Sequence, residues 1–194
     1  MTLRSLVTHD DERGQLTELF RETWAASGEA PPSQWNWLRS RKGTLRGVQV
    51  HPRRRDYLVL VAGRAIVGLR DLRPGVESHG MVACVELRAE EPSALSIPFG
   101  VAHGFLYLED SLQLLGLTPT WQQEEDLRCR WDDPALGIPW PERPTRLSAI
   151  DAAAGSFTNL ESAFKAGFAE PHGPKVARPA AAASATSPAA APVE

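Results

Sequence analysis

Two polar side chains on one short segment could do chemistry in this sequence. Gln49 and His51 stand two residues apart in the run LRGVQVHP, residues 45–52. If this run is a strand, side chains at i and i+2 face the same side and lie about 6.6 Å apart. A neutral histidine could then act as a general base, whereas the amide of Gln49 cannot accept a proton near neutral pH. The pair could serve packing, form one corner of a metal site, or be the remainder of a catalytic histidine site.

Short apolar runs surround this segment and predict β-strands. They lie at 57–62, 64–72, 81–87, 94–97, 103–108 and 111–117, and Pro, Gly or acidic residues separate most of them. Short strands at intervals of about 8–12 residues favour an antiparallel barrel or sandwich. Helical periodicity is visible at 159–168, and the segment 16–24 fits a helix or a strand.

The composition sets the class of protein. The chain has 194 residues, 42% of them hydrophobic, which is enough for one domain with a real core. A net charge of −3 argues against a nonspecific nucleic-acid binder. Residues 169–194 are mainly Ala and Pro and cannot bury enough surface to offset their ordering entropy. We therefore expect a domain at 1–168 followed by a disordered tail.

The cysteines and the apolar runs predict a soluble cytoplasmic protein. Cys84 and Cys129 are too few and too far apart for a disulfide framework, so we expect reduced thiols. The first residues hold no apolar stretch of signal-peptide length. No apolar run approaches the roughly 18 residues of a membrane span, so we expect no membrane partner.

Seven segments, in order, resemble the dTDP-4-dehydrorhamnose 3,5-epimerase family. They are DERGQLTELF (11–20), QWN (34–36), LRG (45–47), GLRDLRPG (68–75), IPFGVAHGF (97–105), WDDPALGIPWP (131–141) and LSAID (147–151). The resemblance implies an all-β cupin jelly-roll, or double-stranded β-helix, with a short C-terminal helical part. It implies a homodimer in which an N-terminal strand joins the partner's sheet. It also implies a dTDP-linked 4-keto-6-deoxysugar as substrate, and no metal or other cofactor.

Position by position, the resemblance gives roles to several polar residues. It implies phosphate contacts for Arg13 and Arg46, nucleotide and sugar contacts for Glu18, Gln34 and Asn36, a place near thymine for Trp121, a hydrogen bond to the sugar for His103, and orientation of the base for Asp151. Arginine forks and amides suit a diphosphate and a deoxyribose, and an aromatic ring can stack on thymine. The binding half of the family's site is therefore kept.

The catalytic half of the site is altered. In the family, a base removes a proton beside the C4 ketone and an acid returns a proton from the other face. The base histidine falls at Gln49, and the acid tyrosine falls at Gly116 or Leu115. A lysine ahead of the next strand falls at Asp56, which reverses the charge. The arginine run at 53–55 is expected to be a solvated turn face.

These matches leave three hypotheses. In the first, the chain is an epimerase with altered chemistry, in which His51 or His103 is the base, Asp151 orients it, and one carbon is inverted rather than two. In the second, it is an inactive nucleotide-sugar-binding protein, a partner or a regulator. In the third, it is a metal-dependent cupin, because residues 49–51 and 98–103 resemble both halves of the cupin metal motif, although glutamine is a poor transition-metal ligand.

Overall fold

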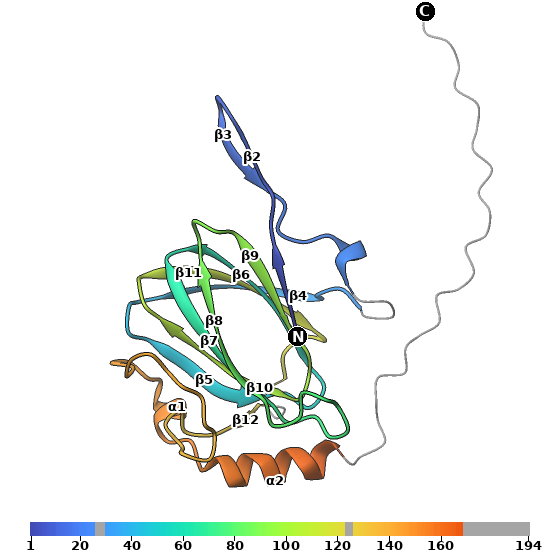
Figure 1. Cartoon of the computed structure of the whole chain (residues 1–194), viewed down its shortest axis with the longest axis vertical. Coiled ribbons are helices and arrows are strands. Elements are labelled where there is room, and N and C mark those ends of the chain that lie inside the picture. The colour runs from blue at the N-terminus through green and yellow to red at the C-terminus, as the bar shows by residue number, and fades with distance from the viewer. Residues whose placement is uncertain (26–29, 123–125, 169–194) are drawn as a thin grey trace, which may run out of the picture.

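Two five-stranded antiparallel sheets face each other and form a jelly-roll (Figure 1). The computed structural model of the protein describes residues 1–25, 30–122 and 126–168. One sheet has the strand order β1-β9-β6-β11-β4 and the other has the order β12-β5-β10-β7-β8. The predicted all-β jelly-roll with a short C-terminal helical part is confirmed.

The elements follow the predicted order. The strands are β1 (Thr2–Ser5), β2 (Thr8–Asp11), β3 (Gly14–Thr17), β4 (Gln34–Ser40), β5 (Leu45–Val50), β6 (Arg55–Ala62), β7 (Arg64–Asp71), β8 (Val82–Arg88), β9 (Ser93–Ile97), β10 (Val101–Tyr107), β11 (Ser111–Thr118) and β12 (Leu127–Arg128). The helices are the 3-10 helix η1 (Glu22–Trp24), α1 (Ala149–Ala152) and α2 (Phe157–Phe168). The six predicted strands are β6 to β11, and the predicted helix is α2. The segment 16–24 holds the end of β3 and η1, and the expected tail lies outside the described residues, so the domain boundary stays a prediction.

Apolar side chains fill the space between the sheets and also cover the outer face of one sheet. Leu58, Leu95 and Phe105 belong to the core between the sheets. A second core holds Val48 and Phe164, so α2 packs on the outer side of β5 and β10. Every residue of β10 is buried as a result, which is why this strand reads as a continuous run rather than an alternating one.

A bulge at Gly47 decides which side chains of β5 face the interior. The register against β10 skips one residue there, since His103 lies opposite Gln49 and Gly104 lies opposite Gly47. Gly47 has a φ of 107°, and a Cβ on it would lie 2.8 Å from the carbonyl oxygen of His103. Because an extra residue reverses the side-chain alternation, Arg46 and Gln49 can line one pocket although they are three residues apart.

The β2-β3 hairpin projects from the jelly-roll in Figure 1. The chain that follows it returns to the outer face of the β1-β9-β6-β11-β4 sheet. There the rings of Phe20 and Tyr57 meet edge to face, with centroids 5.1 Å apart, and Tyr57 donates a hydrogen bond to the carbonyl oxygen of Leu19 over 2.7 Å. Within the described residues, no helix has the length and apolar character needed to cross a membrane.

Candidate functional site

A pocket of about 460 Å³ opens beside β5, β12 and α1. Among the residues that the structure describes, its charged lining consists of Arg46, Arg54, Arg128, Arg146, Asp126 and Asp151. The four guanidinium groups exceed the two carboxylates of this described lining, which gives it an excess of positive charge. Because arginine binds phosphates and carboxylates through paired N–H donors, the pocket suits an anionic ligand.

Five of the predicted site residues line this pocket. They are Asn36, Arg46, Gln49, Trp121 and Asp151. Gln34 lies beside them, because its amide donates to Asn36 Oδ1 over 3.0 Å and its oxygen accepts from the backbone nitrogen of Trp121 over 2.9 Å. The fold therefore brings together, at this pocket, six residues that the sequence analysis named in four distant segments.

Asp151 is paired with an arginine rather than with a histidine. Its Oδ1 accepts a hydrogen bond from Arg128 over 2.8 Å, and its Oδ2 accepts one from Ser148 over 2.8 Å. Ser148 caps α1 and also accepts from the backbone nitrogen of Asp151. The carboxylate next to His51 is that of Asp126, whose Oδ1 lies 2.9 Å from His51 Nδ1. The sequence missed Asp126, because it lies in a polar segment with no periodic pattern.

His51 and His103 lie beneath the pocket, in a buried cluster with Asp56. Each of the three residues is 1% exposed. His103 Nε2 lies 3.0 Å from Asp56 Oδ2, and His51 Nε2 lies 3.7 Å from the same oxygen. The two imidazole rings have centroids 5.2 Å apart. The cluster thus joins His51, which follows β5, to one residue of β6 and one of β10.

Arg54 joins this cluster to the pocket. It donates hydrogen bonds to His51 Nε2, to Asp56 Oδ1 over 3.2 Å and to Asp126 Oδ1 over 3.1 Å, and it is 3% exposed. The expectation that the 53–55 run is a solvated turn face is wrong for Arg54. The two carboxylates offset the cost of burying its charge.

The protonation states in the cluster follow from these contacts. Burial lowers the pKa of His51, and the nearby Asp126 and Asp56 oppose this effect. Burial alone would raise the pKa of Asp56, but His103, His51 and Arg54 lower it to about 2. Since an arginine only donates, His51 Nε2 carries no proton and a neutral ring holds its proton on Nδ1, toward Asp126. Asp56 is therefore a carboxylate at neutral pH.

The position of the family's acid tyrosine offers no proton donor. Leu115 and Leu117 line the pocket. A Cβ on Gly116 would instead meet Pro32 and Trp35 at 2.9 and 3.2 Å. Among the described residues that line the pocket, none is a tyrosine or a histidine.

Two predicted phosphate and nucleotide contacts lie outside the pocket. Arg13 is at the tip of the β2-β3 hairpin, its side chain is 85% exposed, and it pairs with Asp11 over 2.6 Å. Glu18 follows β3 and pairs with Arg21 over 2.8 Å. Within one chain, these two residues do not meet the other predicted ligands.

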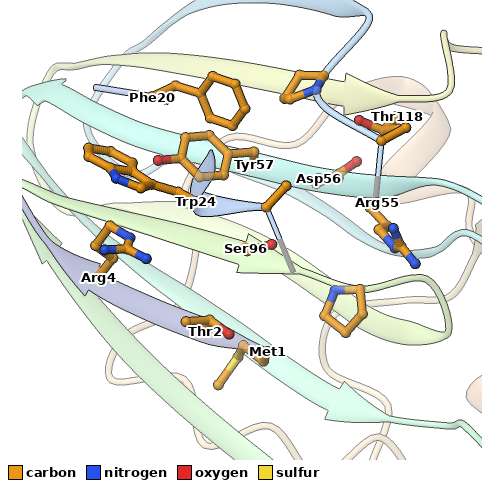
Figure 2. Close-up of a pocket in the computed structure, with 14 residues that line it drawn as sticks. Met1, Thr2, Arg4, Phe20, Trp24, Arg55, Asp56, Tyr57, Ser96 and Thr118 are labelled. Atoms are coloured by element: carbon orange, nitrogen blue, oxygen red, sulfur yellow. The ribbon is translucent and has the colours of Figure 1, made fainter. Parts of the chain in front are cut away.

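A second cavity, of about 170 Å³, lies between the N-terminal segment and the β1-β9-β6-β11-β4 sheet. Figure 2 shows its aromatic side, formed by Phe20, Trp24 and Tyr57, with Arg4 beside Trp24. The guanidinium carbon of Arg4 lies 4.8 Å from the Trp24 ring centroid. None of the predicted site residues lines this cavity, although Asp56 borders it.

Comparisons with known proteins agree with this geometry. The family model described as dTDP-4-dehydrorhamnose 3,5-epimerase matches residues 1–159. The dTDP-4-dehydrorhamnose 3,5-epimerase of Sinorhizobium fredii is 34% identical over 163 residues, which cover 80% of this chain and 84% of that protein. The dTDP-4-dehydro-6-deoxyglucose 3-epimerase of Streptomyces bikiniensis is 32% identical over 143 residues, which cover 70% of this chain and 73% of that protein.

Solved structures give the same result. An rmlC epimerase from Mycobacterium tuberculosis superposes with a TM-score of 0.76 at 27% identity, covering 83% of this chain and 86% of that chain. A 3'-monoepimerase from Streptomyces bikiniensis in complex with dTDP-quinovose superposes with a TM-score of 0.75 at 28% identity, covering 86% of each chain. The resemblance predicted from seven short segments is confirmed, and the chain belongs to the dTDP-4-dehydrorhamnose 3,5-epimerase family, whose members are isomerases.

Proposed function

We propose that this chain is an isomerase that acts on a dTDP-linked 4-keto-6-deoxyhexose by proton abstraction beside the C4 ketone. The observation that carries the proposal is the arginine-lined pocket, in which Arg46, Asn36 and Asp151 occupy positions that match the family's motifs. The relatives are named for such sugars, as 3,5-epimerases or as a 3-epimerase. A place in deoxysugar or polysaccharide biosynthesis follows from this substrate class.

The pocket suits the diphosphate and the base of such a ligand. Arg46 is held by hydrogen bonds from its Nε to Ser40 Oγ over 3.0 Å and from its NH2 to the carbonyl oxygen of Arg39 over 3.4 Å. A guanidinium fixed in this way is preorganised for a diphosphate oxygen. The ring of Trp121 is 47% exposed, so it can offer a face to a base such as thymine.

The catalytic groups come from the buried cluster rather than from the pocket wall. Both carboxylates on the wall are paired with arginines, and Gln49 cannot take a proton. His51 and His103 lie one layer deeper, and Arg54 separates them from the ligand. A diphosphate that draws Arg54 into the pocket would uncover them. With Gly116 or Leu115 at the acid position, inversion at one carbon is favoured over inversion at two.

We also propose that the protein works as a homodimer. Trp35 and Trp37 point outward from β4 and are 44% and 64% exposed, and outward tryptophans of this size are typical of a partner surface. Arg13 on the projecting hairpin would then reach the partner's pocket. The two unpaired cysteines and the net charge of −3 fit a cytoplasmic protein without a nucleic-acid partner.

Proton exchange tests the proposal directly. The protein is incubated with dTDP-4-keto-6-deoxyglucose in D2O, and the C3 and C5 protons are followed by NMR. We expect exchange at one of these carbons, lost in His103→Gln and in His51→Gln and kept in His79→Gln, which changes an exposed histidine far from the pocket. Exchange at the same rate in all four proteins would refute a role for the cluster.

A second function is favoured by one specific observation, the glutamine at the base position. Gln49 lines the pocket and can hydrogen-bond a sugar without reacting. The alternative is therefore a protein that binds a nucleotide sugar and does not turn it over. Calorimetry that shows tight dTDP binding, together with no exchange above background, would select this alternative. If calorimetry detects no heat of dTDP binding and dTDP does not raise the Tm of the protein, both functions are refuted.

A further inference from the structure

Three buried side chains from different strands bring metal-ligating atoms together. His51 follows β5, Asp56 belongs to β6 and His103 belongs to β10. One ligand atom from each lies within 4.8 Å of the others. Two imidazole nitrogens and one carboxylate oxygen form a donor set that suits first-row divalent transition metals.

Both imidazole rings are held so that Nε2 faces Asp56. His103 Nδ1 bonds to the carbonyl oxygen of Val101 over 2.9 Å, which leaves Nε2 toward Asp56 Oδ2. His51 Nδ1 faces Asp126 Oδ1 at 2.9 Å, which leaves Nε2 toward the same Asp56 oxygen. A backbone carbonyl or a carboxylate usually fixes the second nitrogen of a metal-bound histidine. Here the Val101 carbonyl bonds to His103 Nδ1, whereas the Asp126 carboxylate lies close to His51 Nδ1 without an aligned hydrogen bond.

The atoms that face one another lack well-formed hydrogen bonds. His103 Nε2 and Asp56 Oδ2 are close enough for an ion pair, but they are not aligned for a hydrogen bond, and neither atom has a hydrogen-bond partner elsewhere among the described residues. Buried polar atoms are nearly always hydrogen-bonded, so an exception calls for an explanation. A cation between these atoms would satisfy both of them.

Arg54 supplies the positive charge in the metal-free protein. Its guanidinium donates to His51 Nε2 and to Asp56, so it competes for the lone pairs that a metal would use. Arg54 also lines the pocket of about 460 Å³, which gives the side chain space to turn into.

We propose that His51, Asp56 and His103 form a binding site for one divalent first-row transition metal ion, which displaces the Arg54 guanidinium. The ion would add positive charge beneath a pocket that already suits an anionic ligand. A bound ion would occupy Nε2 of His51 and His103, so these atoms could act as bases only in the metal-free protein. The inference goes beyond the proposed function and does not depend on it, because metal binding is measured without a sugar.

The experiment uses the full chain without an affinity tag, stripped with EDTA, and titrates it with Co²⁺ and Ni²⁺ by calorimetry. The visible spectrum of the Co²⁺ form reports nitrogen and oxygen ligands, and circular dichroism checks the fold of each variant. We expect one ion per chain. His103→Gln should weaken binding at least 100-fold, Asp126→Asn should weaken it about 10- to 100-fold, and Arg54→Met should tighten it at least tenfold.

Two matched controls separate this site from adventitious binding. His79→Gln removes an exposed histidine and Cys84→Ser removes an exposed thiol, and neither should change the affinity. The proposal is overturned if the native chain binds less than one ion, if folded His103→Gln binds as well as the native chain, or if Arg54→Met binds no more tightly.

Discussion

Removal of the Arg46 guanidinium should cost the protein most of its affinity for dTDP. Arg46 faces the pocket because of the bulge at Gly47, and Ser40 and the backbone of Arg39 hold its side chain in place. Arg46→Met keeps the length of the side chain and removes the donors. The exposed position of Arg46 on the pocket wall means that the change should alter binding without unfolding the protein.

The size of the effect follows from the kind of contact that is lost. A hydrogen bond to a charged group contributes about 1.5–3 kcal/mol. Since about 1.4 kcal/mol changes a dissociation constant tenfold, the expected weakening is roughly 10- to 150-fold. The loss should shrink as salt rises, because the pocket opens to solvent and the attraction is screened over about 8 Å at physiological ionic strength.

Calorimetry of dTDP binding at two salt concentrations measures this effect. The matched control is Arg88→Met, on β8, where an exposed arginine pairs with Glu86 over 3.1 Å away from the pocket. It should leave the affinity unchanged. A loss of less than twofold in Arg46→Met, or an equal loss in the control, would refute the assignment of this pocket to the diphosphate.

Three further changes test the packing, the charges and the chemistry. Gly68→Ala should lower the free energy of unfolding by about 1–3 kcal/mol, because a Cβ there would lie 2.5 Å from Trp140 and 2.6 Å from Ile138. The control Gly167→Ala, on the open side of α2, should raise the free energy of unfolding by about 0.5–1 kcal/mol. Equal Tm shifts in the two variants would contradict the close packing of Gly68 against Trp140 and Ile138. Contacts with Arg73 and Ser78 outweigh burial and lower the pKa of Asp71 from 3.8 to about 2, so their stabilisation is present above about pH 4 and is lost as pH falls through about 2. Denaturant unfolding should therefore show Asp71→Asn less stable than the native chain at pH 7, with the gap closing near pH 2, and a gap that is constant with pH would contradict this assignment. Gln49→His returns an imidazole to the pocket wall and should raise C3 or C5 proton exchange in D2O about 10²- to 10⁴-fold, whereas an unchanged rate would mean that the ketone does not lie beside this position.

Most of the fold could be predicted from local patterns. The strands β6 to β11 are short apolar runs bounded by turn residues, and α2 has a clear helical period, so each is determined within its own segment. The bulge at Gly47 could not be predicted from spacing, because it depends on how closely β10 approaches β5. The bulge changes which residues of β5 share one face of the sheet, and the periodicity of the sequence does not reveal where such a bulge occurs.

Sequence motifs could name residues of the candidate site, but they could not predict contacts between charged residues that lie far apart in the sequence. The motifs singled out Arg46, Gln49 and Asp151, and all three line one pocket. Burial of Arg54 depends on Asp126, 72 residues away, and no local pattern encodes a pair of that separation. Asp151 lines the pocket but pairs with Arg128 instead of orienting a histidine, so a motif can keep its place while its partner changes.

The projecting β2-β3 hairpin has a genetic consequence. If Arg13 of one chain serves the pocket of its partner, each site is encoded by two copies of the gene product. A chain altered at Arg13 and a chain altered at Arg46 would each be defective alone. A mixed dimer of the two would hold one site with both changes and one site with neither, so two defective alleles in one cell would restore part of the function.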